Sequence, residues 1–119
     1  MNKQKLIFYG ATGVFSLMMI GSATMYFVSE EASQVFLALG FPSYFRIELG
    51  IGKYLGVIAL LAPRVPDNVR EWAYAGFGIT LISAAIAHSA VGDPATKIIA
   101  PAVAFALLAM SYLFRKKQN

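Results

Sequence analysis

The sequence predicts an all-α membrane protein, a four-transmembrane-helix bundle with a short interfacial helix between the first and second spans. Hydrophobic residues make up 58% of the 119 residues and only 13% are charged. In a soluble domain of this size roughly a quarter of all residues are charged, and the interior could not bury so many apolar side chains. Lipid is therefore the expected solvent, and residues 1–119 are expected to form a single domain.

The charges and the absence of cysteine exclude several classes of function. The net charge is +4, but the basic residues lie in the gaps between apolar runs and form no basic face, so nucleic acid is not an expected partner. A chain without cysteine has no disulfides, thiolate metal sites or iron–sulfur ligands. We predict no metal site and no covalent cofactor, and any electron transfer would need an external group.

Residues 6–28 are predicted to form the first span. This run is uncharged and, at about 1.5 Å per residue, is long enough to cross a hydrocarbon core of about 30 Å. Lys3 and Lys5, followed by the small residues at 21–23, also fit a secretory signal with a cleavage site. The apolar run continues to Val28, which is long for a signal and favours a span.

Residues 29–41 are predicted to form a short interfacial helix, because Glu30 and Glu31 precede apolar positions that share one helical face. Gly40 is placed to end it. Pro42 suits the first turn of a second span over residues 42–62, since its missing N–H costs nothing there. This span is expected to end before Pro63, which disfavours helical geometry in the preceding residue.

The third and fourth spans are predicted over residues 71–91 and 94–114. Gly92 would cap the third span, and Asp93 would cap the fourth, with Pro94 at its first helical position. Tyr26 is assigned to the aromatic belt of the outer membrane interface. Both termini are expected in the cytoplasm, because Arg46 and Lys97 are alone on the outer side. The inner side holds Lys3, Lys5, Arg64, Arg70, Arg115, Lys116 and Lys117.

Three ionisable residues within the spans, Glu48, Lys53 and His88, are the predicted ligand-binding residues. Each would cost a few kcal/mol facing lipid at mid-depth, so all three are expected to face the interior of the bundle. On a helical wheel Glu48 and Lys53 flank a strip formed by Gly52 and Gly56. This G-x-x-x-G pattern allows close approach of a neighbouring helix.

The third span supplies a matching stripe of small residues, Gly76, Thr80 and Ala84, which leads to His88. Together with Gly52 and Gly56 these residues are the predicted helix-packing positions. Because the second and third spans are antiparallel, the acid and the imidazole both fall in the outer half of the membrane. A small pocket is expected between them, and no residue is assigned a catalytic role.

Structural interpretations of the same residues stay open. Lys53 can snorkel to the interface, and His88 lies near enough to a helix end to be an interfacial or packing residue. Glu48 can form a purely structural lock with either of them. A glycine pattern more often marks helix packing than a ligand site.

Four segments resemble the DoxX-like family of small four-helix membrane proteins. They are residues 39–45, 48–64, 71–77 and 88–94, which read LGFPSYF, ELGIGKYLGVIALLAPR, EWAYAGF and HSAVGDP. The resemblance covers nearly the whole chain and implies a four-helix bundle in a bacterial cytoplasmic (inner) membrane. The family includes a subunit of a thiosulfate:quinone oxidoreductase and partners of membrane oxidoreductases, so the resemblance also implies a quinone as a non-covalent ligand.

Three functions are carried forward from the sequence. The first is binding of a quinone-like or other hydrophobic molecule by a redox-associated subunit, in which Lys53 or His88 donates to a carbonyl and Glu48 sets their protonation. The second is a non-catalytic partner or assembly factor, bound to another membrane protein or to copies of itself. The third is a proton-coupled small-solute transporter, which would need an oligomer. Whether the chain is an enzyme stays open.

Overall fold

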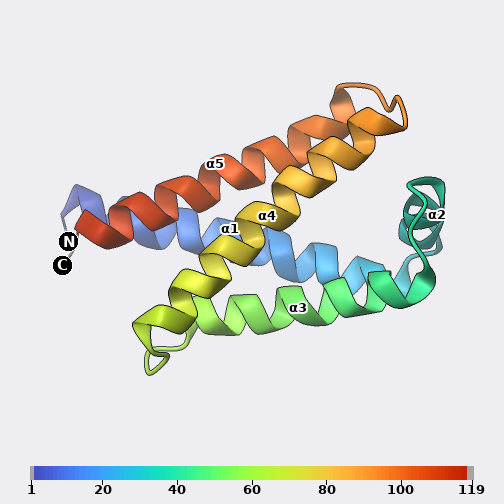
Figure 1. The fold of residues 1–119 in the computed structure, drawn as a ribbon. Coiled ribbons are helices and arrows are strands. Elements are labelled where there is room, and N and C mark those ends of the chain that lie inside the picture. Colours follow the sequence, from blue (N-terminus) through green and yellow to red (C-terminus); the bar gives the residue numbers. More distant parts are fainter. Residues whose placement is uncertain (1, 118–119) are drawn as a thin grey trace.

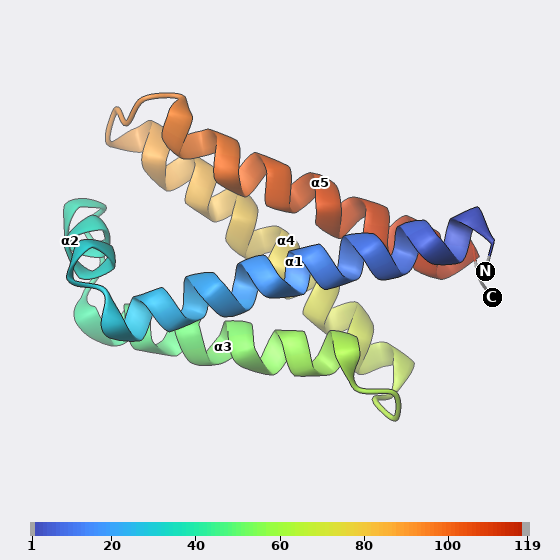
Figure 2. The same ribbon diagram turned by 180° about the vertical axis from the view of Figure 1, so that it is seen from behind.

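The structure, a computed structural model, describes residues 2–117, without the side chains of residues 116 and 117. The described chain folds into five helices: α1 (Lys3–Val28), α2 (Glu30–Ala38), α3 (Ser43–Leu61), α4 (Asp67–Ala90) and α5 (Thr96–Lys117). Helix α1 packs between α3 and α5, and α4 packs against both α5 and α3. The short α2 lies across the end of the bundle where α3 begins (Figures 1 and 2). The predicted all-α fold and the short helix after the first span are confirmed.

The chain is a multi-pass membrane protein with three to four candidate spans, where the sequence predicted four. Helices α1 and α4 and the Thr96–Arg115 part of α5 are each long and apolar enough to cross a membrane. Helix α3 holds three charged residues, Arg46, Glu48 and Lys53, within its 19 residues. It qualifies as a span only together with α2, and a bend of 115° separates the two helices.

Three predicted helix starts are wrong. Helix α1 begins at Lys3, three residues before the predicted start at residue 6. Helix α4 begins at Asp67, four residues before the predicted start, because the helix continues beyond the apolar run through polar residues that follow Pro66. Helix α5 begins at Thr96, after the predicted start at Pro94, so Asp93 is not its N-cap. A hydropathy profile detects only the apolar part of a helix that faces lipid, so it misses polar helical turns at either end of a span.

Glycine ends both α2 and α4, as predicted. Gly40 and Gly92 have positive φ angles of 88° and 76°, which other residues rarely adopt. After each glycine, the next residue donates its N–H to the carbonyl five positions earlier, at 3.0 Å after α2 and 2.9 Å after α4. This is the Schellman arrangement, and it folds the residue after the glycine back over the last turn of the helix.

The centre of the bundle is built around Phe15 of α1, whose side chain is 0% exposed. Its ring meets the ring of Phe77 edge-on, with 5.0 Å between the centroids. Phe77 in turn lies against Gly56 of α3, where an added Cβ would stand 2.6 Å from the ring. These three residues therefore fix the spacing of α1, α3 and α4. The surrounding core consists of Met19, Val57, Leu60, Tyr74, Leu81, Ala104 and Leu108.

A buried hydroxyl network joins α1, α4 and α5 in the part of the bundle where α1 begins and α5 ends. The Oγ atom of Ser111 lies 2.5 Å from the Thr12 hydroxyl and 2.7 Å from the Tyr74 hydroxyl. All three residues are buried, so each hydroxyl is satisfied by another side chain rather than by water.

Ion pairs close the same end of the bundle. Arg115 is only 7% exposed and pairs with Asp67 and, at 3.3 Å, with Glu71. Arg70 donates to the carbonyl of Ala62 at the end of α3. Helices α3 and α4 are thus held close at the turn that joins them, and they diverge toward α2 (Figures 1 and 2).

Candidate ligand-binding site

A cavity of about 540 Å³ lies where α3 and α4 diverge, with α2 as one of its walls. We call it the α2 cavity. Its lining combines the aromatic and aliphatic residues Tyr26, Val35, Phe36, Leu39, Phe41, Phe45, Leu49 and Leu81 with the polar residues Lys53, Thr80, Ser83 and His88, among others. Its size and its mainly apolar lining with a few polar groups are typical of small-molecule sites.

Aromatic contacts hold α2 in place as the wall of this cavity. Phe36 of α2 is 7% exposed, and its ring centroid lies 4.9 Å from that of Tyr26 in α1. The turn at Gly40 brings Phe41 back to within 6.1 Å of Phe36, and Phe41 packs at 4.8 Å against Phe45 of α3. The predicted interfacial helix is therefore joined by aromatic side chains to both α1 and α3.

Lys53 is buried in the wall of the cavity, with 6% of its surface exposed. Its Nζ donates to Ser22 Oγ at 2.8 Å and to Tyr26 Oη at 2.6 Å, and it lies 4.4 Å from the centre of the Tyr26 ring. Ser22 and Tyr26 are one helical turn apart, so α1 presents both from the same face. The amine is held inward rather than extended to a membrane surface.

Neither partner of Lys53 was predicted from the sequence. Tyr26 was placed in the interfacial aromatic belt, and Ser22 was considered only as part of a cleavage site. The available signal in the sequence was the four-residue spacing of Ser22 and Tyr26, which places both on one face of the first span.

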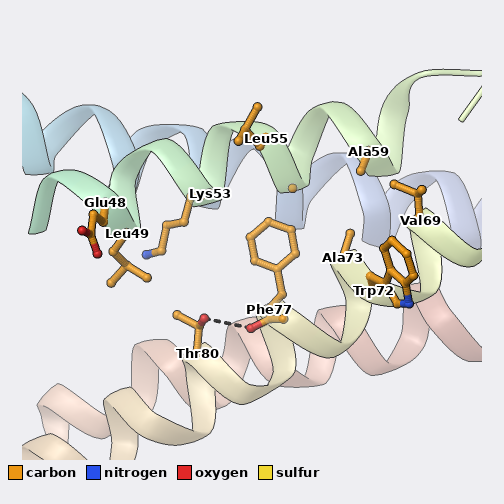
Figure 3. A pocket seen from close by; sticks show the side chains of 13 residues that line it. Glu48, Leu49, Lys53, Leu55, Ala59, Val69, Trp72, Ala73, Phe77 and Thr80 are labelled. Carbon is orange, nitrogen blue, oxygen red and sulfur yellow. Dashed lines mark hydrogen bonds between the residues drawn. The ribbon is translucent and has the colours of Figure 1, made fainter. Parts of the chain in front are cut away.

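Glu48 lies one turn before Gly52 and is exposed. Within residues 2–117 its carboxylate has no hydrogen-bond or salt-bridge partner among the side chains, so neither predicted lock, to Lys53 or to His88, is formed. Figure 3 shows Glu48 and Lys53 projecting from the side of α3 that faces α4. The two residues border a second hollow that lies beside the α2 cavity.

This second hollow, the glycine groove, has a volume of about 380 Å³ and lies between α3 and α4 (Figure 3). Its lining includes Glu48, Leu49, Gly52, Lys53, Gly56, Trp72, Gly76, Phe77 and Thr80. Phe77 fills the space beside Gly56, whereas a Cβ added at Gly52 or Gly76 would meet no atom within 4 Å. Thr80 donates to the Gly76 carbonyl at 2.8 Å. Leu49, Lys53 and Thr80 also line the α2 cavity, so the two hollows adjoin.

His88 lines the α2 cavity and pairs with Asp93, whose Oδ2 lies 2.6 Å from Nδ1 of the imidazole. The Schellman turn at Gly92 produces this pair, because it folds Asp93 back over the last turn of α4. Lys97 lies 3.9 Å from the other carboxylate oxygen. The carboxylate orients the ring and occupies Nδ1, which leaves Nε2 for a ligand. The predicted capping role of Asp93 is thus replaced by a contact with a predicted site residue.

The structure brings the three predicted ligand-binding residues to adjoining hollows but not into contact. Lys53 and His88 line the α2 cavity together with Ala84, and Lys53 and Glu48 line the glycine groove. In the described part of the chain, no group of three His, Asp or Glu side chains is placed to hold a metal ion. The arrangement offers an amine donor and a carboxylate-oriented imidazole in an apolar cavity, groups that can bind an oxygen atom and exchange a proton with it.

Comparison with known protein families places most of the chain in one of them. Residues 10–111, from α1 into α5, match the DoxX-like family. Neither the curated proteins nor the solved structures include a match to the chain. The matched range contains the α2 cavity, the glycine groove and the His88–Asp93 pair. The chain therefore belongs to the DoxX-like family, as its four sequence segments predicted.

Proposed function

We propose that the chain binds a hydrophobic small molecule with a quinone-like head group in the α2 cavity, as a redox-associated membrane subunit. The observation that carries this proposal is the buried amine of Lys53 in the wall of an aromatic cavity of about 540 Å³. Aromatic side chains pack favourably against a planar ring, and the amine donates to a ring carbonyl. A quinone offers both of these features.

The polar residues of the two hollows have separate roles in this proposal. Lys53 positions the head group by a hydrogen bond, and His88, oriented by Asp93, exchanges a proton with an oxygen of the ligand. Glu48, exposed in the adjoining groove, accepts or supplies protons from outside the cavity. The chain has no cysteine, and a partner oxidoreductase would supply the electrons.

The proposed setting is a bacterial cytoplasmic membrane with both termini in the cytoplasm. The start of α1, the end of α5 and the turn between α3 and α4 lie toward one end of the bundle (Figures 1 and 2). Most of the Lys and Arg residues outside the helix centres belong to that end, which favours its placement on the cytoplasmic side. In this orientation the α2 cavity occupies the outer half of the membrane.

Filling the cavity tests the proposal. Ala84 lines the α2 cavity, whereas the adjacent Ala85 lies on another surface of α4 with Ile86 and Ser89. In lipid nanodiscs the Ala84→Trp variant is expected to bind a short-chain quinone at least about tenfold more weakly than the wild type, because the indole occupies the space of the ring. Equilibrium dialysis with protein-free nanodiscs as the blank measures this.

Ala85→Trp is the matched control, since it adds the same side chain one position away. It is expected to bind like the wild type. Equal affinities of the wild type and Ala84→Trp would remove the cavity as the binding site.

The glycine groove supports a second candidate function, docking of a helix from a partner membrane protein. Gly52 and Gly76 leave open space on facing helices, which lets another backbone approach closely. A cysteine introduced at Gly52 would be the chain's only thiol. Crosslinks from it in native membranes to another protein support docking, and recovery of the uncrosslinked chain alone counts against it.

A further inference from the structure

We propose that the α2 cavity selects a ligand whose head group carries a negative charge on the oxygen that Lys53 binds. This inference rests on the proposed function and specifies the chemical class of its ligand: one anionic oxygen on an apolar body. It follows from the hydrogen bonds of Lys53, from the charges around it and from the walls of the cavity.

The amine of Lys53 has one donor left for a ligand. An ammonium group has three N–H donors, and two of them are used by Ser22 and Tyr26. No third acceptor lies within hydrogen-bond distance in the part of the chain that the structure describes. Lys53 is only 6% exposed, so the remaining donor is buried. Leaving a buried donor without an acceptor costs free energy. An oxygen atom of a ligand in the cavity supplies that acceptor.

The positive charge of Lys53 lacks a counter-ion among the described residues. Over residues 2–117 no carboxylate lies within ion-pair distance of its Nζ. Asp93 is already shared by His88 and Lys97, and Glu48 is exposed in the groove. Two neutral hydroxyls and the Tyr26 ring stabilise the ammonium group. A buried charge of this kind gains most from an anionic partner.

The remaining walls restrict the body of the ligand. Phe36, Phe45 and Leu49 face the cavity and offer no hydrogen bonds, so the part of the ligand that packs against them is apolar. Two sources provide an anionic oxygen on such a body: an ionised hydroxyquinone and a long-chain carboxylate. The first agrees with the proposed quinone-like head group, and the experiment separates it from the second.

Two pairs of ligands that differ mainly in charge test the inference in zwitterionic nanodiscs at neutral pH. The first pair is an ionised 2-hydroxy-3-alkyl-1,4-naphthoquinone and its neutral 2-methoxy ether. The second is a long-chain fatty acid and its methyl ester. After correction for partition into protein-free nanodiscs, the wild type is expected to bind the hydroxyquinone at least about tenfold more tightly than the ether, because a charge-assisted hydrogen bond is lost in the ether.

Lys53→Met is expected to abolish this preference, because binding of the hydroxyquinone falls at least about tenfold further than binding of the ether, which loses only a neutral carbonyl contact. Residual ether binding that is lost when Ala84→Trp is added shows that the cavity is still formed. Lys97→Met is the matched control, because Lys97 is half exposed and does not line the cavity. It is expected to keep the preference. A preference that survives Lys53→Met would overturn the assignment to Lys53.

The other outcomes separate this inference from the proposed function. A preference confined to the fatty-acid pair keeps the anionic oxygen but overturns the quinone-like head group. Equal binding of the hydroxyquinone and the ether, with both lost in Ala84→Trp, overturns the inference and leaves the proposed function in place. Binding of none of the four molecules overturns both.

Discussion

Replacing Phe15 by Ala is expected to lower the free energy of unfolding by about 3–5 kcal/mol. The Phe15 ring is completely buried and supports the Phe77 ring at 5.0 Å. Removing it leaves a void among α1, α3 and α4, and packing contacts of this kind are what hold helices together in lipid. Unfolding in bicelles by added dodecyl sulfate, followed by circular dichroism, measures the loss.

Leu17→Ala is the control for this prediction. Leu17 lies on the same helix but is 71% exposed, so the shortened side chain leaves no void, and the expected change is within about 0.5 kcal/mol. If the two variants lost similar amounts of stability, Phe15 would not be the packing centre of the bundle.

Gly56→Val is expected to cost about 1–3 kcal/mol, the second largest effect on stability. A Cβ at this position would lie 2.6 Å from the Phe77 ring, which Phe15 prevents from moving aside. The added methyl groups would therefore push α3 away from α4. The same dodecyl sulfate titration measures the change.

Gly52→Val provides the comparison, because both glycines belong to one G-x-x-x-G pattern. A Cβ at Gly52 would meet no atom within 4 Å. Since valine replaces glycine within a helix in both cases, the difference between the two variants isolates the contact with Phe77. We expect Gly52→Val to stay within about 0.5 kcal/mol of the wild type. Equal losses at the two positions would show that the groove is closed in the membrane.

The sequence predicted most of the fold because each span must satisfy its backbone hydrogen bonds internally and face lipid with apolar side chains. The glycines that end α2 and α4 were also predictable, since few other residues adopt a positive φ. The polar extension of α4 to Asp67 was not, because charged residues that pair within the bundle resemble a loop in a hydropathy profile. Asp67, the first residue of α4, pairs with Arg115 of α5.

The candidate site was predicted only in part. Burial of a charged residue in a span is costly, which led to Lys53 as a residue that faces the interior. Its partners, Ser22 and Tyr26, come from α1. Which residues of α1 meet Lys53 depends on how α1 packs against α3, and this packing cannot be read from the sequence of α3 alone. The His88–Asp93 pair arises from the backbone turn at Gly92, whereas the aspartate before Pro94 had suggested a helix cap.

Native mass spectrometry of the protein extracted gently from its own membranes tests the central claim that the α2 cavity holds a small molecule. The wild type is expected to carry one bound small molecule per chain, and Ala84→Trp is expected to carry none, while Ala85→Trp resembles the wild type. The same bound mass on Ala84→Trp as on the wild type would contradict the claim.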